Sequence, residues 1–246
     1  GPPAPTSQPP GDHAADAIFD PVAMARARAA LVRENGGMSH TMLLVDMLEW
    51  QARKGGNGYA WEGEAWVGGD IDRLTIKSEG EGVAGGALES AEVHALWSHA
   101  VDPWWNLQLG VRQDIRPKPA RSYVAAGIEG LAPYWFKVTA SAFLSDKGDL
   151  LGRVEASHDM RLTQRLILTP RAEVNFAAQD VPEQGIGAGL SQLELGARLH
   201  YAFVPRFAPY VGVEWAGAFG DSARYVRAAG DEARRTNLVA GVRLWF

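Results

Sequence analysis

Cysteine is absent from the 246 residues of this chain, and so is any long apolar run. A membrane-spanning helix needs about 18 or more consecutive apolar residues, and no segment approaches that length without charged side chains. This excludes a helical membrane protein but not a membrane β-barrel, whose strands alternate apolar and polar residues. The lack of thiols suits a chain that passes through an oxidising compartment, because it avoids unwanted disulfides.

Basic residues are too few for a nucleic-acid partner. The chain has 24 lysines and arginines against 29 aspartates and glutamates, a formal charge of -5, whereas phosphate binding needs a basic surface. The proline-rich start, residues 1–5, lacks a basic and apolar leader, so we expect that a leader has been removed.

Apolar and polar residues alternate from His40 onward, in segments separated by clusters of Gly, Pro, Asp and Asn. Each segment is long for a globular strand but suits a tilted membrane strand of about 9–11 residues. Twelve strands are predicted, or ten if one hairpin is misassigned, the first strand being the weakest. The predicted strands cover residues 40–53, 58–69, 71–81, 88–100, 104–115, 121–131, 134–145, 149–160, 164–178, 188–203, 208–219 and 234–246.

The fifth of these strands illustrates the alternation. Leu107, Leu109 and Val111 share one face, and Gln108 and Arg112 lie on the other. The same pattern recurs in the eighth, tenth and last strands, as expected when one face meets lipid and the other a polar interior. A soluble β-sandwich also alternates, so the connections between the strands have to distinguish the two folds.

Short turns follow every second predicted strand, and longer loops are predicted over residues 177–187 and 220–233. Short turns on one side and longer loops on the other are typical of outer-membrane barrels. Aromatic residues gather beside the short turns and predict a membrane-interface girdle. The predicted girdle consists of Trp104, Trp105, Tyr134, Trp135, Phe136, Phe203, Phe207, Tyr210, Trp245 and Phe246.

These patterns predict an all-β protein of the cell outer membrane, a closed antiparallel up-and-down transmembrane β-barrel formed by residues 38–246. Residues 1–37 are predicted to be a flexible periplasmic segment with disordered residues 1–12 and one short helix. Asp20 can cap that helix, Pro21 suits its first position, and Gly36 and Gly37 end it.

The predicted polar faces carry charges of both signs, which must pair in a narrow lumen because an isolated buried ion is very costly. Two interpretations remain open. The charges form either a salt-bridged plug or a polar path for a cation.

Soft metal ligands concentrate near the start of the predicted barrel. Four of the five methionines lie in the first fifth of the chain, and Met38, His40 and Met42 alternate along one extended segment. Residues two apart in a strand share a face, and thioether and imidazole groups favour Cu(I). The segment therefore predicts a copper site, unless Met42 and Met47 are lipid-facing or core residues and His40 an ordinary surface residue.

Long blocks of sequence, in order, resemble the CopB/PcoB family of outer-membrane copper-resistance proteins. The blocks are Trp-Glu-Gly-Glu-Ala-Trp at 61–66, Lys-Ser-Glu-Gly at 77–80, Leu-Ala-Pro-Tyr-Trp-Phe at 131–136, Leu-Thr-Gln-Arg-Leu-Ile-Leu at 162–168, Gly-Ile-Gly-Ala-Gly-Leu-Ser at 185–191, Phe-Ala-Pro-Tyr-Val-Gly-Val-Glu-Trp at 207–215 and Val-Ala-Gly-Val-Arg-Leu-Trp-Phe at 239–246. The resemblance implies a barrel in the outer membrane that serves periplasmic copper homeostasis beside a periplasmic multicopper oxidase.

Our first hypothesis is therefore a passive copper channel, with the copper ion and the lipid bilayer as partners. Met38, His40 and Met42 would capture Cu(I) at the periplasmic side. Oxygen and nitrogen ligands would follow in the lumen, namely Glu62, Glu64, Glu92, His94, Asp114 and His200. A plugged structural barrel, whose N-terminal segment binds periplasmic partners or copper without transport, is the alternative.

An enzyme is not expected. Ser157, His158 and Asp159 are contiguous, but neighbours in a strand face opposite ways and cannot form a catalytic triad. A Gly-x-Ser-x-Gly motif and a phosphate-binding loop that ends in Lys-Ser or Lys-Thr are both absent from the sequence.

Overall fold

The computed structural model describes residues 18–31, 39–54, 56–204 and 206–246, which divide into two units, one ending at His40 and one beginning at Thr41. In the first unit, helix α1 (Pro21–Leu31) begins after Asp20, whose carboxylate accepts hydrogen bonds from the backbone N–H groups of Val22 (3.3 Å) and Ala23 (3.2 Å). The predicted end at Gly36 and Gly37 lies outside the described residues. Among those described, no helix has the length and apolarity needed to cross a bilayer.

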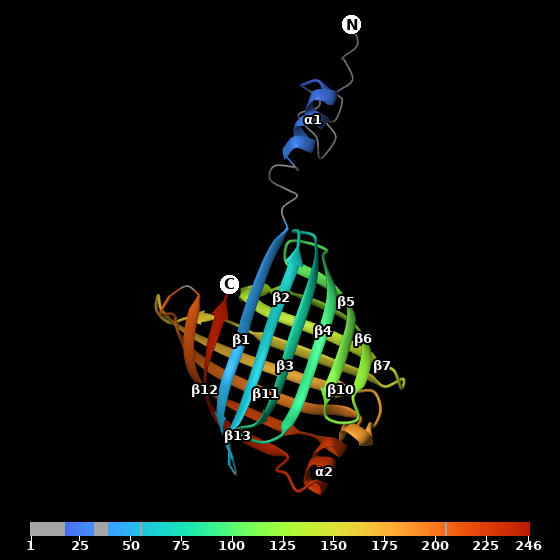
Figure 1. Ribbon diagram of the computed structural model, residues 1–246, viewed down its shortest axis with the longest axis vertical. Helices are drawn as coiled ribbons and strands as arrows, with labels where there is room; N and C mark the ends of the chain where they lie inside the picture. The colour runs from blue at the N-terminus through green and yellow to red at the C-terminus, as the bar shows by residue number, and fades with distance from the viewer. Residues whose placement is uncertain (1–17, 32–38, 55, 205) are drawn as a thin grey trace. The chain divides into compact units, whose positions relative to one another are not determined.

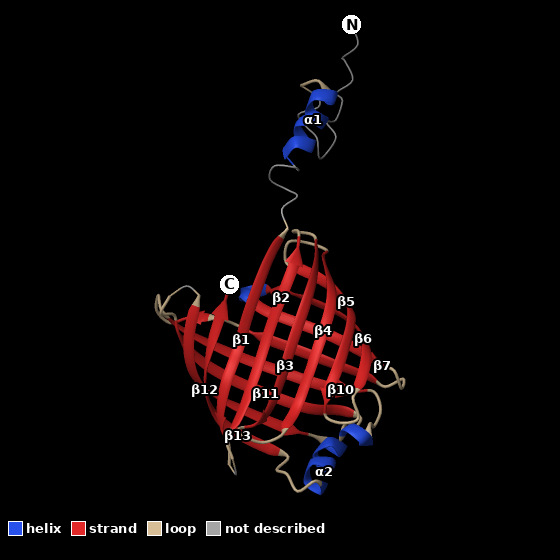
Figure 2. Ribbon diagram, in the orientation of Figure 1, coloured by secondary structure: helices blue, strands red, loops and turns tan. Residues whose placement is uncertain are grey.

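The second unit is a barrel of twelve long antiparallel strands and one two-residue strand, β9 (Figures 1 and 2). The strands are β1 (His40–Ala52), β2 (Gly58–Gly68), β3 (Asp72–Val83), β4 (Leu88–Ala100), β5 (Trp105–Arg116), β6 (Arg121–Ala132), β7 (Phe136–Ser145), β8 (Leu150–Ser157), β9 (Met160–Arg161), β10 (Leu166–Ala177), β11 (Gly189–Tyr201), β12 (Phe207–Ala218) and β13 (Arg234–Trp245). The predicted fold class is confirmed, with twelve long strands rather than ten.

Each long strand pairs with its neighbours along the chain, and β13 pairs with β1 to close the barrel. The last residue takes part in this seam. Leu43 and Phe246 exchange two backbone hydrogen bonds, of 3.1 and 2.8 Å. Closure satisfies the backbone groups that an open sheet edge would leave unpaired in lipid.

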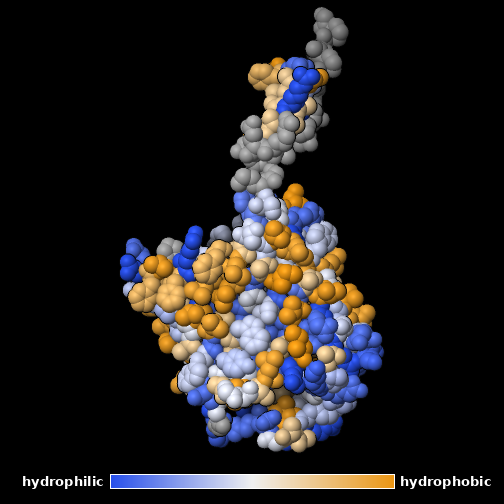
Figure 3. Space-filling model, in the orientation of Figure 1, coloured by the Kyte–Doolittle hydropathy of each residue, from blue (hydrophilic) through white to orange (hydrophobic). Residues whose placement is uncertain are grey.

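The barrel is apolar outside and polar inside. The largest fully buried side chains are Gln51, Asn237, Thr75 and Ser98, whereas Val124 and Leu238 are more than 60% exposed on the outer face. Figure 3 shows apolar side chains spread over the outer face of the strands in view. This is the distribution expected of a barrel whose outer surface contacts lipid.

Tyr210 departs from the predicted aromatic girdle. Trp104, Trp135 and Phe203 are more than half exposed beside the short turns, as predicted. Tyr210 is instead buried in the lumen, where its hydroxyl donates to the Glu49 carboxylate at 3.2 Å. Tyr210 lies on the same face of the sheet as Glu214 of β12 and His200, its partner in β11, and both of these line the lumen. Strand alternation therefore decides its direction, although its neighbours in the sequence predicted a girdle residue.

The two ends of the barrel are built differently. Short connections, one of them the 3-10 turn η3 (Pro133–Trp135), join strands at the end where β1 starts and β13 finishes. The opposite end carries the 3-10 turn η4 (Pro182–Gln184) and helix α2 (Gly220–Ala228) within the two long connections. The sequence predicted only a loop where α2 lies.

Candidate functional site

Acidic side chains form a row across four neighbouring strands inside the barrel. The sheet register places Glu62 of β2 opposite Glu79 of β3, Glu79 opposite Glu92 of β4, and Glu92 opposite Asp114 of β5. Like charges directly opposite each other are destabilising. The row therefore requires cations close by.

A second acidic row lies on the opposite wall. Glu155 of β8 is opposite Glu173 of β10, and Glu173 is opposite Glu194 of β11. In the strand order of the closed barrel, β8 to β11 lie across the lumen from β2 to β5. Two lines of carboxylates thus face each other.

Arg153 of β8 and Arg171 of β10 bridge the two rows. Arg153 binds Glu79, Glu92 (2.9 Å) and Glu173 (3.4 Å). Arg171 binds Glu62, Glu155 (3.1 Å) and Glu173 (3.5 Å). We call these two arginines and their five carboxylates the arginine belt, and it crosses the middle of the lumen.

Carboxylates outnumber guanidinium groups in the belt. Arg112 adds a third cation, 2.5 Å from Glu92, but brings its own carboxylate partner Asp114 at 2.6 Å. A surplus of three carboxylates remains against the three arginines named here. A region with such a surplus attracts cations and repels anions.

The belt separates two cavities. One, of about 300 Å³, lies toward the short turns and is lined by Glu64, His94 and His200 among others. The other, of about 220 Å³, lies toward α2 and is lined by Glu81, Glu194 and Glu214 among others. The residues that line both cavities are Met47, Glu62, Glu79, Arg153, Arg171 and Arg198.

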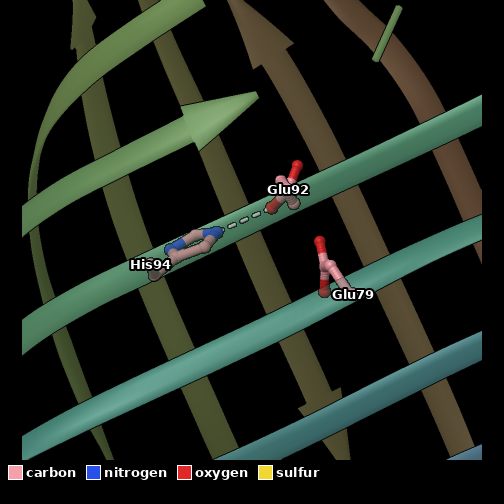
Figure 4. Close-up of side chains that lie close together, drawn as sticks. All are labelled: Glu79, Glu92 and His94. Carbon is pink, nitrogen blue, oxygen red and sulfur yellow. Dashed lines mark hydrogen bonds and ion pairs between the residues drawn. The ribbon is translucent and has the colours of Figure 1, made fainter. Parts of the chain in front are cut away.

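Glu79, Glu92 and His94 form the most compact group of potential metal ligands within the described part of the chain (Figure 4). One ligand atom from each residue lies within 4.8 Å of the other two. His94 Nε2 and Glu92 Oε1 are hydrogen-bonded at 2.7 Å. Two carboxylates and one imidazole, all facing the lumen, can coordinate a divalent cation once the neighbouring arginines release them.

The remaining predicted lumen ligands are separate from this group. Glu64 lies 3.8 Å from the Lys77 ammonium in the cavity near the short turns. Asp114 is buried and held by two hydrogen bonds from Arg112, of 2.6 and 3.1 Å. His200 is 96% buried beside the Tyr210 ring, and its Nδ1 finds no partner among the described residues.

The segment predicted to capture copper begins β1. His40 is the first, exposed residue of that strand, and Met42 is half-buried two residues later. Met38 lies outside the described residues. The role predicted for these three residues stays a prediction.

The alternation pattern missed two lumen residues, and the predicted ligand set left out a third. Glu79 was placed on a polar face but not among the ligands. Glu49 and Met47 were missed because a bulge in β1 changes which residues face inward. The only sequence signal for it is the run Leu43-Leu44-Val45-Asp46-Met47-Leu48-Glu49, which breaks strict alternation.

Comparisons with known proteins agree with this architecture. Residues 39–246 match the family model described as copper resistance protein B precursor (CopB). Copper resistance protein B from Escherichia coli is 42% identical over 231 residues, covering 92% of this chain and 78% of that protein. A copper resistance protein B homolog from Pseudomonas syringae pv. tomato gives the same identity and coverage. In fold, a structure of the NanC porin is similar over 82% of this chain and 98% of its own, with a TM-score of 0.54 at 12% identity.

Proposed function

The chain belongs to the copper resistance protein B family, and we propose that its outer-membrane barrel binds copper and lets copper ions cross the membrane down their gradient. The facing acidic rows are the observation that carries this proposal. They hold seven carboxylates in the lumen, Glu62, Glu79, Glu92, Asp114, Glu155, Glu173 and Glu194.

Glu194 adds support on the side of the long loops. Its carboxylate accepts a 2.6 Å hydrogen bond from Gln192, and no cationic group of the described residues lies within 4.0 Å of it. Glu194 and the ion-paired Glu81 and Glu214 line the cavity there. Copper would meet carboxylates on both sides of the belt.

Transport in this proposal is passive and the barrel is not an enzyme. The sequence has no phosphate-binding loop. His158 is engaged outside the lumen, since its ring stacks on Phe136 at 4.7 Å. Asp159 instead accepts a 2.7 Å hydrogen bond from Thr169. These partners argue against joint action of Ser157, His158 and Asp159.

The arginine belt favours one rival function, a barrel plugged at rest. Arg153 and Arg171 join opposite walls through ion pairs, and such pairs persist unless a competing cation releases the carboxylates. A plugged barrel would still bind copper but would not conduct it.

Copper flux separates the two functions. The full chain would be reconstituted in vesicles that contain a Cu(I) indicator, and copper would be added outside or inside. We expect flux above that of empty vesicles. His94→Gln should slow copper flux by about tenfold, the scale on which loss of a metal-binding contact acts, because the Glu79, Glu92 and His94 group loses its imidazole.

His99→Gln is the matched control, because His99 is paired with Asp72 at 2.8 Å on the outer face. Its flux should equal that of the unmodified protein. Flux no higher than in empty vesicles, in either direction, would establish the plugged barrel instead.

We further propose that Met38, His40 and Met42 capture Cu(I) before it enters the lumen and that a periplasmic multicopper oxidase is a partner. Soft thioether and imidazole groups favour Cu(I), and His40 is exposed. Changing all three residues to alanine should weaken Cu(I) binding in calorimetry, with Met160→Ala as the control. Unchanged affinity would remove this site from the proposal.

A further inference from the structure

A β-bulge in β1 turns one methionine into the lumen. The pairing with β13 runs from Val45 opposite Leu244 to Leu48 opposite Val242, so that Asp46 and Met47 together face Arg243. Both then line the cavity near the short turns. Bulges of this kind redirect side chains and are over-represented beside functional sites.

Met47 lies where the two cavities meet, since it lines both. Methionine ordinarily fills gaps in an apolar core, but the residues that share this position are charged: Glu62, Glu79, Arg153, Arg171 and Arg198. An apolar side chain among five charged ones gains little from packing. Its sulfur is what sets it apart.

The sulfur of Met47 already contacts a cation. Arg171 Nη1 lies 4.0 Å from Met47 Sδ, and the same nitrogen donates to the carboxylate of Glu62. A thioether is only a weak hydrogen-bond acceptor. The guanidinium nitrogen thus contacts both a thioether and a carboxylate, the two groups that a small cation in its place would meet.

Arg171 has other partners if it gives up that position. Its Nη2 binds Glu155 at 3.1 Å and lies 3.5 Å from Glu173. A cation that took the place of Nη1 would leave the guanidinium paired on its other side. Arg171 and Glu62 would then both keep a partner of opposite charge. Breaking a buried ion pair is costly because it leaves a charge without such a partner.

We propose that Met47 and Glu62 form a site for soft monovalent cations where the two lumen cavities meet, with Arg171 as its resident cation at rest. Cu(I) binds thioethers well, whereas hard cations such as Na⁺ and K⁺ do not. Only a soft cation gains enough binding free energy to displace Arg171. The site therefore selects the Cu(I) oxidation state of copper as well as copper over hard metal ions. This inference rests on the proposed copper binding and deepens it.

The test uses Ag⁺, a soft monovalent cation that is stable in air, and the full chain labelled with ¹³C in its five methionine methyl groups. The Met47→Leu spectrum identifies the Met47 signal by its disappearance. We expect Ag⁺ to shift this signal in the unmodified protein and K⁺ to leave it unmoved. Because this measurement is made on the unmodified chain, it stands even if Met47→Leu folds poorly. In that case Met24→Leu, Met38→Leu, Met42→Leu and Met160→Leu assign the other four signals and leave that of Met47.

Vesicle flux supplies the second readout. Met47→Leu conserves the side-chain volume and loses the sulfur. Ag⁺ and Cu(I) flux should therefore fall by about tenfold or more, while K⁺ conductance stays unchanged. Met160→Leu, at an exposed position in β9, should change neither.

The two measurements distinguish this inference from the proposed function. Copper flux with an unmoved Met47 signal overturns the Met47 site and leaves the channel intact. A shifted Met47 signal without flux supports the site but makes the barrel a copper-binding plug. If neither is observed, both proposals are wrong.

Discussion

Arg153 and Arg171 are the residues on which the state of the lumen depends. They are the cations that span the two acidic rows, and they are held at side-chain exposures of 13% and 19%. Their burial makes each ion pair hard to break without a replacement cation. The same two residues therefore stabilise the barrel and obstruct it.

Replacing Arg153 with alanine should open the lumen and destabilise the barrel together. The change leaves Glu79 and Glu92 without this partner, and breaking a buried ion pair costs about 3–5 kcal/mol. K⁺ conductance in planar bilayers should rise several-fold, and the urea midpoint of unfolding should fall. Arg161→Ala is the control, because Arg161 is exposed. If Arg153→Ala conducts K⁺ no better than Arg161→Ala, the path is closed elsewhere.

Strand alternation predicts the lumen residues well wherever a strand is regular. Glu62, Glu92 and His94 were placed on polar faces by period two, and they do face the lumen. The pairings between them could not be predicted, because Arg171 and Glu62 are far apart in the sequence and meet only across the closed barrel. Met47 lies in a bulge, and one extra residue reverses the parity of all that follows.

At the scale of elements, the two long connections cover one end of the barrel together. The backbone N–H of Gly187 donates to Ser222 Oγ of α2 at 2.8 Å, and this contact is buried. Glu183 of η4 reaches Arg121 of β6 at 2.5 Å, and Gln184 accepts a hydrogen bond from Tyr123 at 3.1 Å. We call this assembly of η4 and α2 the cap.

Ser222→Ala should loosen the cap without unfolding the barrel. The change leaves a buried N–H group unpaired at a cost of about 1–3 kcal/mol, and about 1.4 kcal/mol corresponds to a tenfold change in an equilibrium. Hydrogen exchange at the Gly187 amide should therefore quicken by about tenfold while exchange in β1 to β13 stays constant. Arg224→Ala, at a side chain 67% exposed on the same helix, should leave the Gly187 rate unchanged.

The sequence gives weak signals for α2. Its nine residues include only a few apolar side chains, and Gly220 begins the helix after Phe219 rather than after a side-chain cap. Isolated helices this short are unstable in water. Burial of Ser222 and Ala223, the hydrogen bond from Gly187 and contacts with β11 and β12 hold it in place. A local sequence pattern does not predict such contacts.

For the whole molecule, the strand count, the strand ends and the outward faces were predictable because lipid imposes one rule on every strand. Each must alternate, and each must pair on both sides. The lumen obeys no comparable rule. Its charges have only to balance across the barrel, so many arrangements satisfy the same alternation, and the arginine belt is one of them.

The seam between Leu43 and Phe246 has a consequence for how the protein is made. β1 and β13 lie at opposite ends of the barrel sequence, so the growing sheet keeps two unpaired strand edges until β13 has been made and pairs with β1. Deletion of β13 would leave β1 and β12 as open edges along the barrel, and in a hydrocarbon phase their backbone amides would be unpaired. Completion of the barrel therefore depends on a single late event, the pairing of β1 with β13.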